Sequence, residues 1–312
     1  MNEIAVIDRA ELTAQQTVSA ELFNRYIAFL DASPKTVQTY TRDLKQLFLF
    51  LQERGISQPK RADILAFRDS LKDAGKKPST IQNYITATRL FFRWTAQEGV
   101  YPNIADHLKG AKLDRSHKKD YLASSQVKEI LSTIERDSLK GIRDYAMLVL
   151  MITGGLRTIE VSRADVQDLR TLGDSAVLYL QGKGREEKTE FIKLDPAIEK
   201  AIRAYLKARG QAEPTDPLFT STSNNSRGAR LSSRSVSEIV KDRLRGAGYD
   251  SERLTAHSLR HTAVTLSLLA GKDITEVQQF ARHADISTTM IYSHALDKAK
   301  NSCSKAIADA IL

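Results

Sequence analysis

A small set of basic side chains and one tyrosine stand at spacings that could act on a phosphodiester. His257 and Arg260 lie three residues apart, so a helix would present them on one side. Further along the chain, His283 precedes Tyr292 by nine residues, and far upstream Arg157 follows a pair of glycines. Cationic and hydrogen-bonding groups of this kind favour an anionic substrate.

These residue types could transfer a phosphoryl group out of DNA without a metal ion. A phosphodiester under attack gains negative charge on its non-bridging oxygens, which two arginines can bind through bidentate, permanently charged donors. Imidazoles can complete the hydrogen bonding and accept the proton of the nucleophile. A tyrosine hydroxyl becomes a nucleophile when cations and a base stabilise its phenolate form. A lysine on a hairpin, here Lys183, can protonate the leaving 5′ oxygen.

Signatures of other chemistries are missing from the sequence. It contains no phosphate-binding G-x-x-x-x-G-K-[ST] loop, no H-E-x-x-H and no G-x-S-x-G. His257 and His261 could share a helix face as a metal pair, but a zinc site needs three or four protein ligands and no third is evident. We therefore expect no cofactor and no metal.

The composition agrees with an intracellular partner of nucleic acid. The 312 residues allow about two domains, and 41% hydrophobic residues exclude a wholly disordered chain. Forty-seven Lys and Arg against 38 Asp and Glu leave a net charge of +9, which suits a polyanion, although a solvated lysine surface gives the same balance. No run approaches the ~20 apolar residues of a membrane span, no secretory segment is present, and the single Cys303 cannot form an intrachain disulfide. We expect a soluble, cytoplasmic protein.

Helical periodicity dominates the pattern that must position these residues. Four helices with short loops are predicted at 19–31, 33–55, 61–74 and 79–98, and Ser33 followed by Pro34 is typical of a helix start. The C-terminal part predicts a hairpin of strands 177–180 and 190–194, joined by a charged, glycine-rich stretch. The predicted fold class is mainly α (α+β), a four-helix bundle followed by a helix-rich domain with a small antiparallel sheet. The helices expected in that second domain are 124–135, a second ending near 151, 196–208, 232–245, 257–270, 273–282 and 288–293.

Four stretches resemble the phage integrase family of tyrosine recombinases, and the size and layout are similar to its Xer-type members. The stretches are TGGLRTIE at 153–160, QGKGREEK at 181–188, HSLRHT at 257–262 and HADISTTMIYSH at 283–294. Any one is weak alone, but their order and spacing together are specific, and the resemblance covers nearly the whole chain. Two departures stand out: Ala281-Arg282 before His283, where the family usually shows Leu-Gly, and the doubled glycine before Leu156.

The resemblance implies a role for each cationic residue. Arg157 and Arg260 would bind the scissile phosphate, and Lys183 would be the general acid for the 5′-hydroxyl leaving group. Arg185 and Lys188 lie in the same expected hairpin, so either could replace Lys183.

The remaining family positions complete the implied reaction. His257 would act as acid and base, His283 would hydrogen-bond the phosphate, and Tyr292 would form a covalent 3′-phosphotyrosine. Glu160 is similar to the acidic residue on the first arginine's helix, where a structural role is expected.

The domain layout follows from the pattern and the resemblance. We expect a flexible lead-in, a core-binding helical domain, a basic interdomain linker, a catalytic domain and a helical tail, at residues 1–17, 18–101, 102–121, 122–297 and 298–312. The linker could cross a DNA backbone or be a plain connector. The tail could be an arm that packs against a neighbouring subunit, as the family suggests, or a helix that closes its own domain.

The implied function is a site-specific DNA recombinase, for integration or excision, that acts without a metal ion. It would be a monomer when free and a homo-tetramer in the synaptic complex on a specific double-stranded recombination site, with no membrane partner. Alternatives are a non-cleaving DNA-binding accessory protein on the same scaffold and a topoisomerase-like nicking–closing enzyme. Chromosome dimer resolution and inversion stay open beside a mobile element, which we prefer. Candidate DNA contacts, which a solvated helix face would explain nearly as well, are Lys35, Thr39, Arg42, Lys77, Thr80, Asn83, Arg230 and Arg234.

Overall fold

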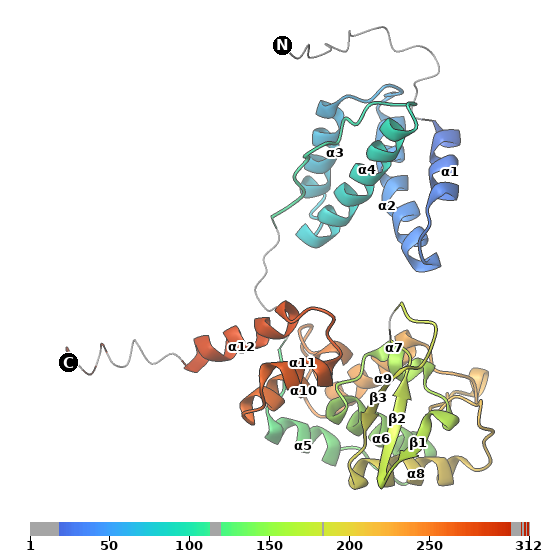
Figure 1. The fold of residues 1–312 in the computed structure, drawn as a ribbon, viewed down its shortest axis with the longest axis vertical. Coiled ribbons are helices and arrows are strands. Elements are labelled where there is room, and N and C mark those ends of the chain that lie inside the picture. The colour runs from blue at the N-terminus through green and yellow to red at the C-terminus, as the bar shows by residue number, and fades with distance from the viewer. Residues whose placement is uncertain are drawn as a thin grey trace. The chain divides into compact units, whose positions relative to one another are not determined.

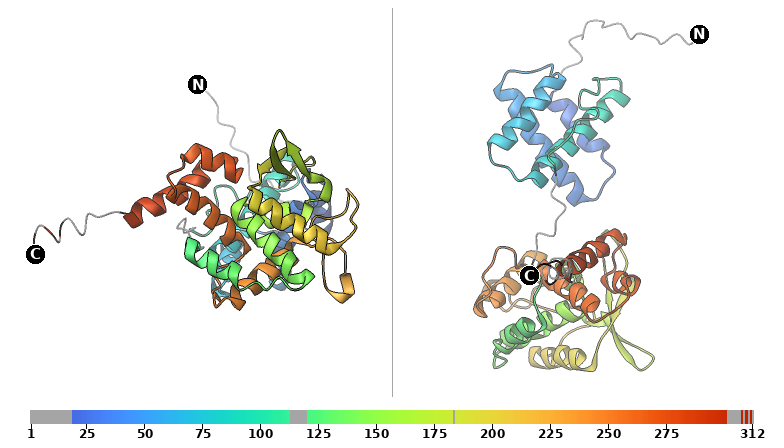
Figure 2. Two further views of the ribbon diagram at one scale, coloured as in Figure 1. Left: turned by 90° about the horizontal axis from the view of Figure 1, so that it is seen from below. Right: turned by 90° about the vertical axis from the view of Figure 1, so that its left-hand side faces the viewer.

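The structure, a computed structural model, describes residues 19–112, 120–182 and 184–300, and positions 307, 309 and 311. The chain divides into two compact units, one up to residue 115 and one from 116 onward, and each is described by itself (Figures 1 and 2). The lead-in expected at 1–17 lies outside the described residues, as does most of the tail expected at 298–312.

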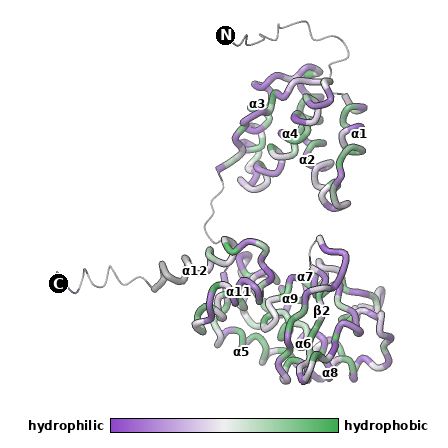
Figure 3. The backbone as a smooth tube through the Cα atoms, viewed as in Figure 1, coloured by the Kyte–Doolittle hydropathy of each residue, from purple (hydrophilic) through white to green (hydrophobic). Residues whose placement is uncertain are grey.

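The first unit is a bundle of four helices, and the four predicted helices are confirmed. Ser19 and Ser33 cap the first two through their side chains, each of which accepts from the backbone N–H three residues on. The inward faces form one core rich in aromatic rings, with Tyr26, Phe91 and Trp94 in mutual contact. Figure 3 shows hydrophobic residues recurring between hydrophilic ones along these helices. The helices are α1 (Ala20–Phe29), α2 (Pro34–Glu53), α3 (Arg61–Asp73) and α4 (Pro78–Gln97).

The first part of the segment expected as a linker packs against this bundle. Ala105 and Leu108 are almost fully buried in its core, and Arg68 Nη1 donates to the carbonyl oxygen of Lys109 at 3.2 Å. These apolar residues are mixed with charged ones and lack a clear period, so the sequence indicated an interdomain linker. Residues 113–119 of the same segment lie outside the described part.

The second unit combines eight α-helices with a three-stranded antiparallel sheet in its described part, which confirms the predicted fold class. The predicted hairpin pairs β2 with β3 in register, Leu178 opposite Ile192. A third strand, β1, pairs with the other edge of β2 and was not predicted, because it has four residues that are mostly exposed. The elements are α5 (Ser124–Ser132), α6 (Leu139–Thr153), α7 (Thr158–Arg163), β1 (Leu169–Leu172), β2 (Ser175–Leu180), β3 (Glu190–Lys193), α8 (Pro196–Arg209), α9 (Ser233–Gly246), α10 (Ala256–Leu269), α11 (Ile274–Ala281) and α12 (Ser287–Lys300), with 3-10 turns at Val166–Asp168 and Asn224–Ser226.

The core of the second unit fixes the elements that carry the candidate residues. Most of α6 is buried, and it packs against α8 on one side and α10 on the other. α10, α11 and α12 pack against one another, while the end of α12 extends away from the unit (Figures 1 and 2). The short helix predicted at 288–293 corresponds to α12, which is longer than expected. No helix in the described part is both long and apolar enough to cross a membrane.

Candidate active site

Arg157 is held at the start of α7 by a reciprocal contact with Glu160. The backbone N–H of Arg157 donates to Glu160 Oε2 at 2.8 Å, and its guanidinium donates to Oε1 at 2.9 Å. Glu160 is 1% exposed, whereas the arginine side chain keeps 30% of its surface accessible. Burial alone would raise the pKa of Glu160, but Arg282 and Arg157 outweigh it and hold that pKa below its ordinary value.

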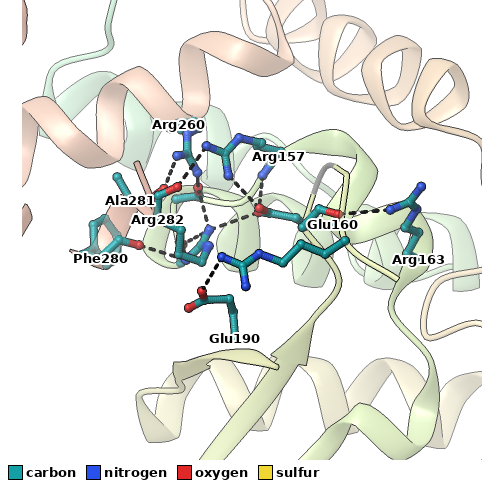
Figure 4. A network of polar contacts seen from close by, with 12 residues as sticks. Arg157, Glu160, Arg163, Glu190, Arg260, Phe280, Ala281 and Arg282 are labelled. Carbon is teal, nitrogen blue, oxygen red and sulfur yellow. Dashed lines mark hydrogen bonds and ion pairs between the residues drawn. The ribbon is translucent and has the colours of Figure 1, made fainter. Parts of the chain in front are cut away.

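Arg260 reaches the same place from α10, although 103 residues separate it from Arg157 (Figure 4). Its guanidinium donates to the carbonyl oxygen of Gly155 at 2.6 Å and to that of Ala281. Burial, together with the charges of Arg157 and Arg282, lowers the pKa of Arg260 to about 9. The group thus stays cationic at neutral pH in a site that is already positive.

A third guanidinium, from Arg282, completes the cluster shown in Figure 4. Arg282 has a left-handed backbone with φ of 53°, and its side chain is 8% exposed. It donates to Glu160 Oε2 at 3.1 Å and to the carbonyl oxygens of Gly154 and Gly155 at 3.4 and 3.2 Å. The two departures from the family pattern, this arginine and the doubled glycine, are therefore in direct contact.

The cluster has more positive than negative charge. Three guanidiniums surround one buried carboxylate, which leaves an excess of two positive charges. A cavity of about 580 Å³ opens beside the cluster between the β2–β3 hairpin and the α11–α12 turn. A hydrogen-bonding anion such as a phosphate matches both the charge and the space. The cavity is lined in part by Arg157, Glu160, Arg185, Glu190, Arg282 and His283.

His283 and Tyr292 lie on the α11–α12 side of the site. The ring of His283 shares a hydrogen bond of 2.9 Å, through Nδ1, with Thr289 Oγ1, and it stacks 6.4 Å from the ring of Tyr292. Burial, followed by the charges of Arg260 and Arg157, lowers the pKa of His283 to about 4, so the imidazole is neutral at pH 7. Burial raises the pKa of Tyr292 to about 12, against the opposing effect of the same two arginines.

His257 stands at the exposed beginning of α10, one turn from the buried His261. The two rings meet edge to face at 4.5 Å, and His261 in turn lies 5.1 Å from the ring of Tyr292. A row of three aromatic rings therefore leads from the surface to the tyrosine. Within the described residues, no three His, Cys, Asp or Glu side chains group as a metal ion would require.

The predicted general acid Lys183 lies outside the described residues, but its hairpin is anchored on both sides. Arg163 at the end of α7 donates to the carbonyl oxygen of Gly182 at 3.1 Å. Lys188 bonds Asp165 and Asp168, each at 2.5 Å, and is thus committed to holding the hairpin. Of the two substitutes that the sequence left open, this contact disfavours Lys188.

Some of the candidate DNA-contacting side chains are exposed to solvent, and others form ion pairs within the protein. Lys35, Lys77 and Asn83 are exposed at the starts of α2 and α4, and the half-buried Thr39 and Thr80 lie on the same two helices. Arg42 is 64% exposed and bonds the buried Asp43. In the second unit, the Arg234 side chain is 89% exposed and pairs with Glu238.

Arg230 is tied into the fold. Its guanidinium donates to the carbonyl oxygens of Ser162 and Ala164 at the end of α7, and to Asp165 at 2.6 Å. This arginine therefore supports the helix that begins at Arg157. Three supporting residues were not singled out by their type: Arg163, Thr289 and, apart from its departure from the pattern, Arg282. A non-glycine residue at the usual glycine position was the one available signal for the last of these.

Known sequences with the same pattern cover most of the chain. Residues 120–299 match the phage integrase family, and residues 20–99 match the phage integrase N-terminal SAM-like domain. The tyrosine recombinase XerC of Herpetosiphon aurantiacus is 34% identical over 268 residues, which cover 83% of this chain and 84% of that protein. The tyrosine recombinase XerD of Oceanobacillus iheyensis is 30% identical over 272 residues, covering 84% and 88%.

Solved structures share the fold at lower identity. A crystal structure of the XerH site-specific recombinase bound to palindromic difH substrate has a TM-score of 0.73 and 20% identity, over 92% of this chain and 85% of that one. A lambda integrase dimer bound to a COC′ core site has a TM-score of 0.67 and 19% identity, over 87% of this chain and 97% of that one. The chain therefore belongs to the phage integrase family of tyrosine recombinases, enzymes that break and rejoin DNA in site-specific recombination.

Proposed function

We propose that this enzyme cleaves DNA by attack of the Tyr292 hydroxyl on a phosphodiester held by Arg157 and Arg260. The observation that carries the proposal is the excess of buried guanidinium charge next to this tyrosine. Attack forms a bond between the tyrosine oxygen and the phosphorus and breaks the bond to the 5′ oxygen of the next nucleotide. The DNA 3′ end is then linked to Tyr292, and the phosphodiester energy is kept for religation.

Proton transfers are assigned to the neighbouring side chains. The pKa of about 12 keeps the phenol of Tyr292 protonated before attack, so a base must accept its proton. His257 takes this acid–base role at the exposed end of the ring row, and neutral His283 hydrogen-bonds a phosphate oxygen. Lys183, on the hairpin anchored by Arg163, protonates the leaving 5′ oxygen. The arginines supply the positive charge, so the proposed reaction needs no metal ion.

We propose that both units bind the DNA substrate. Residues 18–101 would act as the core-binding domain, and 122–297 as the catalytic domain. Relatives solved with DNA, XerH on difH and lambda integrase on a core site, support a specific double-stranded site as the substrate. Candidate contacts are the exposed side chains at the starts of α2 and α4 and Arg234, whose ion pair with Glu238 is exposed to solvent. Arg42 and Arg230 instead pair with the more buried carboxylates of Asp43 and Asp165.

Assembly and context follow from the same proposal. We infer a tetramer on paired sites formed from free monomers, in which residues 298–312 dock on a neighbouring subunit. The extension of α12 and the exposed Met290 and Ile291 on it support this. We propose that the enzyme acts in the cytoplasm and recombines a mobile element.

Covalent trapping tests the proposal. Wild-type protein and Tyr292→Phe are incubated in EDTA with nicked DNA that carries the flanking sequence of the gene itself. We expect a denaturation-resistant protein–DNA adduct from the wild type and none from the variant. Tight binding of intact wild type without any adduct would contradict cleavage and favour an accessory DNA-binding protein. Relaxation of supercoiled DNA that lacks the site would instead favour a nicking–closing enzyme.

A further inference from the structure

Two backbone turns supply the carbonyl oxygens that accept hydrogen bonds from the candidate phosphate-binding arginines. Arg260 donates to the carbonyl oxygen of Gly155 in the first turn and to that of Ala281 in the second. Arg157 follows the first turn in the chain and donates across to the carbonyl oxygen of Arg282 at 3.3 Å. The position of both guanidiniums therefore depends on how the two turns are joined.

Arg282 joins the turns through both its backbone and its side chain. Its carbonyl oxygen accepts from Arg157, while its guanidinium crosses to the carbonyl oxygens of Gly154 and Gly155 and to Glu160. The side chain is almost fully buried, and the left-handed backbone that aims it there disfavours residues with a Cβ. Residues held in a strained conformation by many partners cluster at functional sites.

We propose that Arg282 is a positioning residue of the cleavage reaction, which locks the 154–155 turn to Glu160 so that Arg157 and Arg260 face one phosphate. The inference rests on the proposed function and deepens it. By neutralising Glu160 from a second side, Arg282 leaves part of the Arg157 guanidinium available to an anion. It touches no reacting atom in this scheme and acts through its neighbours.

The charge of Arg282 gives the proposal a readout besides activity. Burial and the charges of Arg260, Arg157, Arg282 and His257 together hold the pKa of His283 low, and the ring of Tyr292 faces the same imidazole. Loss of the Arg282 charge must raise the pKa of His283, whereas a substitution that acts only on folding would not. Titration of the ¹³C-labelled imidazole in DNA-free protein measures this shift.

The experiment compares three substitutions at position 282 with a matched control. We expect Arg282→Gln to slow adduct formation about 100-fold, as a displacement of about 1 Å in the bound groups does, and to raise the pKa of His283. Arg282→Lys keeps the charge without the planar fork, so its His283 pKa stays near that of the wild type while cleavage recovers in part. Arg203→Gln removes an exposed ion pair with Glu199 on α8 and should change neither quantity.

Arg282→Gly separates positioning from backbone strain. Glycine adopts the left-handed conformation without cost, so the variant should fold with wild-type helix content yet cleave as slowly as Arg282→Gln. Cleavage by either variant within twofold of the wild type would overturn the proposal, and so would slow cleavage with an unchanged His283 pKa. Failure of the wild type itself to form an adduct would refute the proposed function, and the His283 titration would still decide whether Arg282 sets the electrostatics of the site.

Discussion

The carbonyl oxygen of Gly155 accepts from both Arg260 and Arg282, so Gly155→Ala is an informative perturbation. Its φ is +57°, where an L-residue costs ~1–2 kcal/mol, partly offset by ~0.4–1 kcal/mol from a less flexible unfolded chain. A Cβ there would also lie 3.1 and 3.2 Å from two ring carbons of Phe280. That ring is half-buried and can yield in part, so the overpacking adds about 1 kcal/mol. We expect a total loss of about 2 kcal/mol of unfolding free energy.

Gly173 offers a control with the same backbone and no neighbour. Its φ is also +57°, in the turn between β1 and β2, and an added Cβ would meet nothing within 4 Å. Gly173→Ala should therefore lose about 0.5–1 kcal/mol, the backbone contribution alone. Urea unfolding followed by circular dichroism measures both variants. The single tryptophan, Trp94, lies in the first unit, so a transition absent from its fluorescence belongs to the second unit.

The two variants also differ in what they do to the site. The carbonyl oxygen of Gly155 accepts from Arg260 at 2.6 Å, so a shift of this turn displaces that guanidinium and should slow adduct formation about 100-fold. Gly173→Ala should cleave at the wild-type rate. Equal stability losses in the two variants would show that the Phe280 contact costs nothing, and wild-type cleavage by Gly155→Ala would show that this turn does not position Arg260.

Three further outcomes are expected. Burial and nearby arginines hold the pKa of His283 at about 4, against an ordinary value of 6.5. The contribution of His283 to the free energy of unfolding is therefore full above pH 6.5 and is lost as the pH falls towards 4. A His283→Gln variant with the same pH dependence of urea unfolding as the wild type would contradict this. Lys188→Met leaves Asp165 and Asp168 without their lysine and should cost about 3 kcal/mol in urea unfolding, and an unchanged midpoint would exclude an anchoring role. Lys183→Met should slow cleavage about 100-fold or more on normal DNA, and a 5′-bridging sulfur should restore the rate, because a thiol leaving group with a pKa near ~8.5 needs no general acid. Failure of the sulfur substrate to rescue would place the loss elsewhere.

Long periodic segments made most of the fold predictable. The four bundle helices and α8 to α11 begin and end within two residues of their expected limits, since caps and prolines mark their starts. β1 was missed because four mostly exposed residues have no hydrophobic pattern to detect. The burial of Ala105 and Leu108 was also missed, because it depends on a core formed by residues distant in the chain.

The candidate site was predictable as a set of residues but not as a set of contacts. The family resemblance proposed Arg157, Arg260 and Tyr292 as candidates before any geometry was known, and the structure places both arginines close enough to act on the pKa of Tyr292. The ion pair between Arg282 and Glu160 joins positions 122 residues apart, and no local pattern reports such a partner. The sequence likewise left Lys188 open as a substitute for Lys183, whereas the structure shows that Lys188 bonds Asp165 and Asp168.

The proposed reaction is tested most directly by asking whether the oxygen of Tyr292 becomes bonded to DNA. Mass spectrometry of the trapped adduct, after proteolysis and nuclease digestion, locates the attached nucleotide on a single peptide. We expect a phosphodiester at Tyr292 and unmodified peptides for Tyr121, Tyr145 and Tyr249. A nucleotide on any other residue, or an adduct that survives in Tyr292→Phe, would contradict it.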